Sequence, residues 1–178
     1  MERLKNMSGF TLFEIIIALA IIMLISIIAI PGFIRTFSYA NVNGMSDQLA
    51  GDIRYAQQLA ITKVNPAYIQ FYAAGTTVTS PESSNSYKMY SIDPTSNSTT
   101  VVKRVNLDNA YIVQTDFSGN LLRLETNGTT TPSTDGRIFI GQINSNVTTN
   151  NNSHFCAVTV KYSTGKVKVY RDVWPSSW

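Results

Sequence analysis

Apolar residues run almost unbroken through the first part of the chain. Between Ile15 and Ile30 every residue is Ile, Leu, Ala or Met, with the single exception of Ser26. A helix from Phe10 to Phe33 would extend about 36 Å at a rise of about 1.5 Å per residue, which exceeds the hydrocarbon thickness of about 30 Å in a bilayer. The pattern therefore predicts a transmembrane helix, to which we assign residues 10–34.

A helical periodicity of apolar positions continues beyond that stretch. The intervals of four, four, three and four between these positions predict that residues 35–65 continue the helix and pack on a sheet. Pro31 removes one backbone hydrogen bond and should bend the helix without ending it. The helix should end at Asn65-Pro66, because the residue before a proline is disfavoured in the α region. The apolar stripe consists of Met45, Leu49, Ile53, Ala56 and Ala60, and the polar residues off it include Asp47, Gln48, Asp52 and Arg54.

The remainder, residues 66–178, has the composition of β-structure. Runs rich in Val, Ile, Tyr and Thr alternate with Gly, Asn, Asp and Ser, which predicts strands separated by turns. Short turns at 116–120 and 163–165 predict two hairpins, and the Asn/Ser/Thr tracts at 76–86, 126–135 and 144–153 predict loops. The fold class is therefore α+β, with a long N-terminal helix on an antiparallel sheet. The predicted strands are Ala67–Tyr72, Tyr87–Ile92, Thr99–Val105, Tyr111–Thr115, Leu121–Glu125, Arg137–Ile143, Ala157–Tyr162 and Lys166–Tyr170.

Composition agrees with a chain of two parts. The mean hydropathy of the 178 residues is zero, but this mean combines a very apolar first fifth with a polar remainder. About 140 residues follow the apolar stretch, which suits one globular domain. The formal net charge is +3, and a chain without residues 1–9 would lose Arg3, Lys5 and Glu2, leaving +2. That charge is too small to indicate nucleic-acid binding by itself.

Glu14 is a carboxylate at the start of the apolar helix. A charged side chain at membrane depth costs about 2.5–3.5 kcal/mol on insertion scales, so it is usually retained for a function and has a partner. The alternative interpretation is that Glu14 lies at the headgroup level of an ordinary anchor and stays hydrated.

The nine residues before the helix form a short polar leader. Arg3 and Lys5 lie in this leader, so the positive-inside rule predicts a cytoplasmic N-terminus and a domain on the other side of the membrane. A secretory signal peptide is cleaved after its apolar region, and the stretch 29–32 matches such a site poorly. The better position for a cut is at Gly9, before the helix.

The stretch from Gly9 to Glu14, with the basic leader, the apolar helix and Pro31, resembles the class III signal of type IV pilins and of the pseudopilins of type II secretion. The resemblance implies that a prepilin peptidase cleaves after Gly9 and N-methylates Phe10. It also implies that Glu14 neutralises the new N-terminal amine of a neighbouring subunit. An α-amine with a pKa near 7.7–8.0 is cationic at neutral pH, and two opposite charges are cheaper to bury together than alone. Because residues four apart share a helix face, Glu14 could equally reach the amine of its own chain.

Two further segments are similar to H-type minor pseudopilins and related minor type IV pilins: Asp47–Ile61 and the terminal hairpin Val158–Tyr170. The resemblance implies a minor filament subunit of a type II secretion system or a type IV pilus, with no enzymatic activity and no cofactor. The implied partners are the prepilin peptidase, other pilin subunits, and an inner-membrane assembly platform with its ATPase. The implied location is the inner membrane, with a single pass, and then a periplasmic or extracellular filament.

Candidate chemistry outside the N-terminus is sparse. Cys156 is the sole cysteine and His154 the sole histidine, so an intrachain disulfide, a histidine metal cluster and a Ser-His-Asp triad are not predicted. The missing bridge is a departure from many major pilins of Gram-negative bacteria. Cys156 is interpreted as a small buried apolar residue, with pairing between chains as the alternative. The runs at 93–95 and 116–120 carry oxygen ligands suited to Ca²⁺, but a hairpin turn explains the second run equally well.

DNA capture is the alternative function. Basic residues cluster along the last hairpin, with Lys166 and Lys168 on one face and aromatic residues between them, which suits contact with phosphates and bases. A solvated basic strand face explains the same pattern. The candidate nucleic-acid residues are Lys161, Lys166, Lys168 and Arg171, and the interleaved aromatic residues are Tyr162, Tyr170 and Trp174.

Overall fold

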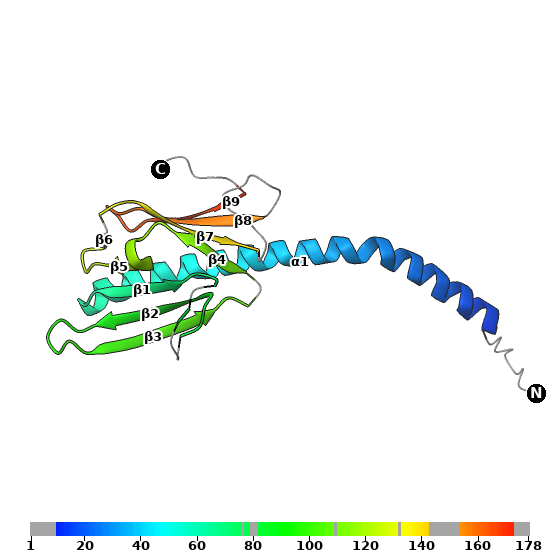
Figure 1. Cartoon of the computed structure of the whole chain (residues 1–178), viewed down its shortest axis with the longest axis horizontal. Helices are drawn as coiled ribbons and strands as arrows, with labels where there is room; N and C mark the ends of the chain where they lie inside the picture. Colours follow the sequence, from blue (N-terminus) through cyan, green and yellow to red (C-terminus); the bar gives the residue numbers. More distant parts are fainter. Residues whose placement is uncertain are drawn as a thin grey trace, which may run out of the picture. The chain divides into compact units, whose positions relative to one another are not determined.

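The computed structural model describes residues 10–75, 77–78, 82–108, 110–131, 133–142 and 154–172. The leader 1–9, the predicted loop at 144–153 and Trp174 lie outside these residues. The described chain contains one α-helix, α1 (Leu12–Lys63), and nine strands (Figure 1). It divides into two compact units between Phe37 and Ser38, and each unit is described by itself.

The first unit is the apolar part of α1. None of the most apolar stretch is buried, and this helix is long and apolar enough to cross a membrane. Pro31 lies inside the helix, which continues on both sides of it as expected. Two hydroxyl groups satisfy their hydrogen bonds within the helix, since Ser26 donates to the Ile22 carbonyl and Thr36 donates to the Gly32 carbonyl. Such internal pairing is needed where water is absent.

The second unit contains the rest of α1, whose buried face confirms the predicted stripe. Its buried residues are Val42, Ser46, Leu49, Ala50, Ile53, Ala56 and Ala60, and Met45 is partly buried against them. The helix ends at Lys63, two residues before the predicted boundary. Val64 follows in the left-handed region with φ 56°, and Pro66 then prevents the helix from resuming.

Nine strands form two antiparallel sheets instead of the single sheet that the sequence predicted. The larger sheet has the order β3-β2-β1-β5-β6 and the smaller has the order β4-β7-β8-β9. In the larger sheet the bounds are β1 (Ala67–Tyr72), β2 (Ser86–Ile92), β3 (Thr99–Asn106), β5 (Leu121–Leu124) and β6 (Thr130–Thr131). In the smaller sheet they are β4 (Tyr111–Thr115), β7 (Gly136–Gly141), β8 (Phe155–Val160) and β9 (Val167–Arg171).

The predicted hairpin at 116–120 is wrong. A 3₁₀-helix, η1 (Ser118–Asn120), joins β4 of the smaller sheet to β5 of the larger sheet. The physical reason is Phe117, which is buried and stacks on Phe71 of β1 with ring centroids 6.2 Å apart. The Gln70 amide also donates to the carbonyls of Gly119 and Asn120. The turn is therefore held against β1 and directs the chain into the other sheet.

The other strand predictions are confirmed to within two residues at each end, and the hairpin at 163–165 joins β8 to β9 as predicted. Strand β6 was missed, because its two threonines lie in a tract predicted to be a loop. The backbone of Thr130 there pairs with β5 and donates to the Tyr162 carbonyl, 3.1 Å away. This bond also connects the larger sheet to the β8–β9 turn.

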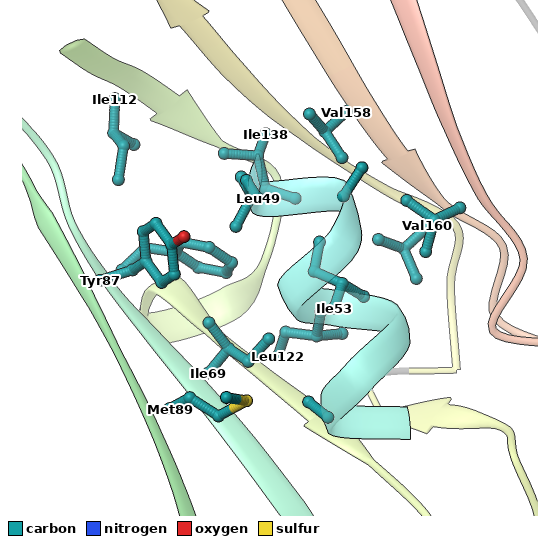
Figure 2. Close-up of a cluster of buried hydrophobic side chains, with 14 of the residues drawn as sticks. Leu49, Ile53, Ile69, Tyr87, Met89, Ile112, Leu122, Ile138, Val158 and Val160 are labelled. Carbon is teal, nitrogen blue, oxygen red and sulfur yellow. The ribbon is translucent and has the colours of Figure 1, made fainter. Parts of the chain in front are cut away.

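The core lies where α1 meets both sheets. Figure 2 shows Leu49 and Ile53 of the helix among side chains from the two sheets. The side chains around them are Ile69, Tyr87, Met89 and Leu122 from the larger sheet and Ile112, Ile138, Val158 and Val160 from the smaller sheet. Burial at about 25 cal/mol per Å² of apolar surface makes this cluster the main source of stability in the unit.

Candidate functional site

The candidate assembly segment begins at Phe10 and includes the first turn of α1. Phe10 and Thr11 precede the helix, and the Phe10 side chain is 80 % exposed. The Thr11 hydroxyl accepts a hydrogen bond from the Glu14 backbone N–H, 3.3 Å away. Thr11 therefore caps the helix, and Glu14 occupies the third helical position, where a carboxylate is favoured by the helix dipole.

Glu14 is exposed, and among the described residues no ion pair involves it. Thr11 and Glu14 have the spacing of a capping box, in which the acidic side chain turns back toward the start of the helix. The sequence predicted Glu14 as a charge with a partner at membrane depth or as a hydrated carboxylate at the headgroup level, and this cap was not foreseen. At this position the negative charge of Glu14 suits the helix dipole, in addition to the pairing that the resemblance implies.

The apolar surface of this segment is continuous. Large side chains from Leu12 to Phe37 point to solvent around the whole helix, including Ile28 at 82 % exposure. A helix that is apolar on every side is stable in a membrane or inside a bundle of other helices. The described residues bury none of its most apolar stretch.

The predicted basic hairpin is not one uniform surface. Lys166 and Lys168 are exposed and share one face of the strand, as expected. Arg171 instead lies three residues beyond Lys168 and binds Asp47 of α1 with N–O distances of 2.8 and 2.9 Å. Lys161 is half-buried, and its backbone closes the hairpin by pairing with Lys166. The structure therefore brings Lys166 and Lys168 together, whereas Arg171 binds α1 through Asp47.

The oxygen-rich turns are occupied by contacts within the chain. The Asp93 carboxylate accepts the backbone N–H groups of Thr95 and Ser96, and these bonds hold the pKa of Asp93 below its usual value. Asp116 pairs with Arg137. Among the residues that the structure describes, no group of three His, Cys, Asp or Glu side chains could hold a metal ion.

Cys156 is fully buried, as predicted, on β8. Its thiol donates to the Asn43 Oδ1 atom, 3.2 Å away. Burial raises the pKa of the Cys156 thiol, which keeps it protonated and weakly reactive at neutral pH. A buried thiol of this kind does not favour a disulfide between chains.

The sequence interpretation missed two polar centres because their partners are remote in the chain. Asp52 accepts hydrogen bonds from the Tyr87 hydroxyl at 2.6 Å and from Lys103 at 2.7 and 2.8 Å. His154 follows the predicted polar loop at 144–153, but it is buried directly before β8. The type of residue at each position was visible in the sequence, but the pairing was not.

Comparisons with known proteins agree with the N-terminal segment and the fold. Residues 4–30 match the model of the prokaryotic N-terminal methylation motif. Two crystal structures of the type IV minor pilin FimU from Pseudomonas aeruginosa are similar, with TM-scores of 0.54 and 0.55 at 12 % and 13 % identity. Each alignment covers 76 % of this chain and 98 % or 93 % of the FimU chain. No match to a curated protein sequence was found.

The chain has a long N-terminal helix packed on antiparallel sheets, which is the fold of type IV pilins. The prokaryotic N-terminal methylation motif matched at residues 4–30 includes the first part of that helix. The chain therefore combines this motif with a fold like that of type IV pilins.

Proposed function

We propose that this chain is a minor pilin or pseudopilin of the H-like group, anchored in the inner membrane and then incorporated into a filament. The observation that carries the proposal is the methylation motif at residues 4–30 on a helix whose apolar surface is exposed on all sides. Such a surface suits a bilayer before assembly and a bundle of neighbouring helices afterwards.

Processing occurs in two steps. The prepilin peptidase cleaves after Gly9 and methylates the amine of Phe10. The exposed Phe10 and the start of the helix at Leu12 support this proposal, since only Phe10 and Thr11 separate the proposed cut from the helix. Basic residues of the leader keep the N-terminus in the cytoplasm, so the peptidase acts on the cytoplasmic side and the second unit lies outside.

The new amine is cationic and lies in an apolar environment, so assembly requires a countercharge beside it. Glu14 provides the compensating carboxylate, either to the amine of a neighbouring subunit or to that of its own chain, which is four residues away. The inner-membrane platform and its ATPase extract the subunit into the filament, where other pilin subunits cover the apolar helix.

The helical segment that resembles H-type subunits has a packing role in the structure. Polar residues of the segment Asp47–Ile61 tie the helix to distant strands. Arg54 donates to the Val167 carbonyl at 3.2 Å, and the Gln57 amide donates to the carbonyls of Gly128 and Thr164 at 2.9 and 3.1 Å. These contacts and the similarity in fold to a minor pilin support a minor subunit, in which the residues of this segment pack the helix against the strands.

Intact mass and N-terminal sequencing test the proposal, on protein from membranes of cells with and without their prepilin peptidase. We expect a chain that begins at Phe10 and carries one methyl group in the first strain, and a chain that begins at Met1 in the second. A Gly9→Val variant should keep Met1 in both strains, whereas Ser8→Ala should be processed. A chain beginning at Met1 in both strains would reduce the protein to a membrane-anchored β domain.

A further inference from the structure

The apolar part of α1 is bounded by one charged residue at each end. Glu14 lies in the first turn of the helix, and Arg35 is the next charged residue along the chain. The helix is unbroken through the 20 residues between them, Ile15 to Ile34 (Figure 1). At a rise of about 1.5 Å per residue this stretch extends about 30 Å, which equals the hydrocarbon thickness of a bilayer. The uncharged stretch therefore matches a membrane in length.

The polar groups inside the stretch suit hydrocarbon. Its one hydroxyl side chain, Ser26, donates to the Ile22 carbonyl at 2.7 Å. Pro31 has no backbone N–H to satisfy. The most apolar window of the helix is not buried by the described residues. Lipid can therefore surround this stretch without leaving a hydroxyl group unpaired.

Arg35 is exposed at the end of the stretch, and among the described residues no ion pair involves it. The adjacent Thr36 hydroxyl is already used, because it donates to the Gly32 carbonyl at 3.0 Å. A guanidinium stays charged in proteins, and its parallel N–H groups match the oxygens of a phosphate. At one bilayer thickness from Glu14, the layer that Arg35 meets is the layer of lipid headgroups, which carries phosphates.

We propose that Arg35 binds the phosphate of an outer-leaflet phospholipid, and that Arg35 and Glu14 together fix the depth of α1 in the membrane. Sliding the helix by one turn in either direction would draw one of the two charges into hydrocarbon, which is strongly unfavourable. Glu14 is hydrated at the inner headgroup level while the subunit stays in the membrane, and it enters apolar surroundings only when the helix leaves the bilayer. The inference rests on the proposed membrane anchoring and adds to it a lipid contact and a fixed depth.

Cysteine labelling measures the depth. The full chain is produced in cells that lack the assembly ATPase, and spheroplasts are treated with a membrane-impermeant maleimide. Ile30→Cys and Phe37→Cys are seven residues apart on one helix face, on either side of Arg35, and both positions are exposed. We expect Phe37→Cys to react at least about tenfold faster, because the reactive thiolate requires water. The buried Cys156 makes the unsubstituted chain the background control.

Substitutions of Arg35 test its part in fixing the depth. In Arg35→Leu the uncharged stretch extends to Ser46, so Phe37 can enter the hydrocarbon, and Phe37→Cys should lose most of its advantage over Ile30→Cys. Arg35→Lys is the matched control and should keep that advantage. Equal labelling of Phe37→Cys in the wild-type, leucine and lysine backgrounds would overturn the depth role of Arg35.

Extraction with alkaline carbonate tests the anchoring separately. Release of the unsubstituted chain from membranes would contradict the proposed anchoring, and the inference with it. Retention of the chain together with unchanged labelling in Arg35→Leu would contradict the inference alone.

Solid-state NMR tests the phosphate contact. The full chain, with ¹³C-labelled arginine, is reconstituted in bilayers of phosphatidylethanolamine and phosphatidylglycerol, and the dephasing of the guanidinium carbon by ³¹P is measured. We expect the dephased fraction to fall in Arg35→Lys, because the labelled group at the outer headgroup level is then missing. An unchanged fraction would overturn the contact between Arg35 and phosphate.

Discussion

At the scale of single residues, two candidate roles of Glu14 can be separated by substitution. Its position three residues after Thr11 suits a capping box, in which a neutral amide can replace the carboxylate. Its proposed pairing with an α-amine requires the negative charge. A substitution that retains the amide geometry but removes the charge therefore distinguishes the two.

We expect Glu14→Gln and Glu14→Ala both to be inserted and cleaved but to be excluded from filaments, because both leave the amine without a countercharge. Capping should differ between them by about 0.5–1 kcal/mol at most. The measurement is the fraction of each variant in sheared filaments relative to membranes. Incorporation of Glu14→Gln at the wild-type level would contradict the charge pairing and leave capping as the role of Glu14.

Gly165 illustrates a residue whose type is dictated by a close approach. Its φ is +60°, and a Cβ atom there would lie 2.3 Å from the Gln57 amide nitrogen and 2.7 Å from the Gly128 carbonyl oxygen. Gly119 has a similar φ of +63°, but nothing lies within 4 Å of a Cβ atom there. Substitution by alanine would therefore carry a similar backbone cost at both glycines. Only at Gly165 would the new Cβ atom also clash with neighbouring groups.

Gly119→Ala should destabilise the second unit by about 1–2 kcal/mol, the cost of the left-handed region for a residue with a Cβ atom. Gly165→Ala should cost at least about 1 kcal/mol more, because it also displaces the Gln57 hydrogen bonds. Urea unfolding of the two variants gives the difference directly. Equal losses would show that Gln57 moves aside without cost.

At the scale of elements, polar side chains fasten the helix and the sheets at fixed points. Asp52 of α1 binds Tyr87 of β2 and Lys103 of β3. Asn85, buried before β2, donates to the carbonyls of Leu107 and Ala110 and accepts the Ile112 N–H of β4. The first centre orients the edge of the larger sheet on the helix, and the second connects the two sheets.

Tyr87 makes the first centre sensitive to alkali. Burial, followed by the neighbouring Asp52 carboxylate, raises the pKa of the Tyr87 hydroxyl. The folded chain keeps the phenol neutral when the unfolded chain ionises it, so stability is complete below about pH 10 and falls as the pH rises further. Tyr87→Phe should lower the free energy of unfolding by about 1 kcal/mol at pH 8. Its further decrease at pH 11 should be smaller than that of the wild type.

Urea midpoints at the two pH values test this expectation. Tyr162→Phe is a suitable control, because Tyr162 is exposed in the β8–β9 turn. An equal alkaline loss in wild type and Tyr87→Phe would show that other groups cause it.

At the scale of the whole molecule, DNA capture remains the alternative to a purely structural role. Lys166 and Lys168 are exposed on one face of the β8–β9 hairpin, whereas Arg171 pairs with Asp47. Lys166→Ala/Lys168→Ala should weaken DNA retention and reduce its salt slope by up to about two if both contact phosphates. The charge-preserving Lys166→Arg/Lys168→Arg variant is the control.

Filter retention of labelled DNA across a salt series measures both effects. Equal retention and an equal salt slope for the alanine and arginine variants would remove the hairpin as a DNA site. Such a result would leave the filament-subunit proposal unchanged, since that proposal does not use these lysines.

Features determined by neighbours along the chain could be predicted from the sequence. The apolar helix follows from a contiguous run, its buried stripe from helical spacing, and the β8–β9 hairpin from the turn residues at 163–165. The signal from Gly9 to Glu14 is also contiguous, and the methylation motif matched at residues 4–30 includes it. In each case the information lies within a few residues, which is the range over which propensity and periodicity act.

Only the tertiary structure decided which remote groups meet. Phe117 enters the core and turns a predicted hairpin into a crossing between two sheets. His154 contacts Asn43 across 111 positions, and Asp52 contacts Lys103 across 51. Such pairs form because the helix and the sheets pack to bury apolar surface, and that packing places their polar groups where each must find a partner. No local pattern encodes those partners, so the sequence determined the elements and the assembly segment, whereas packing determined the crossing and the buried polar centres.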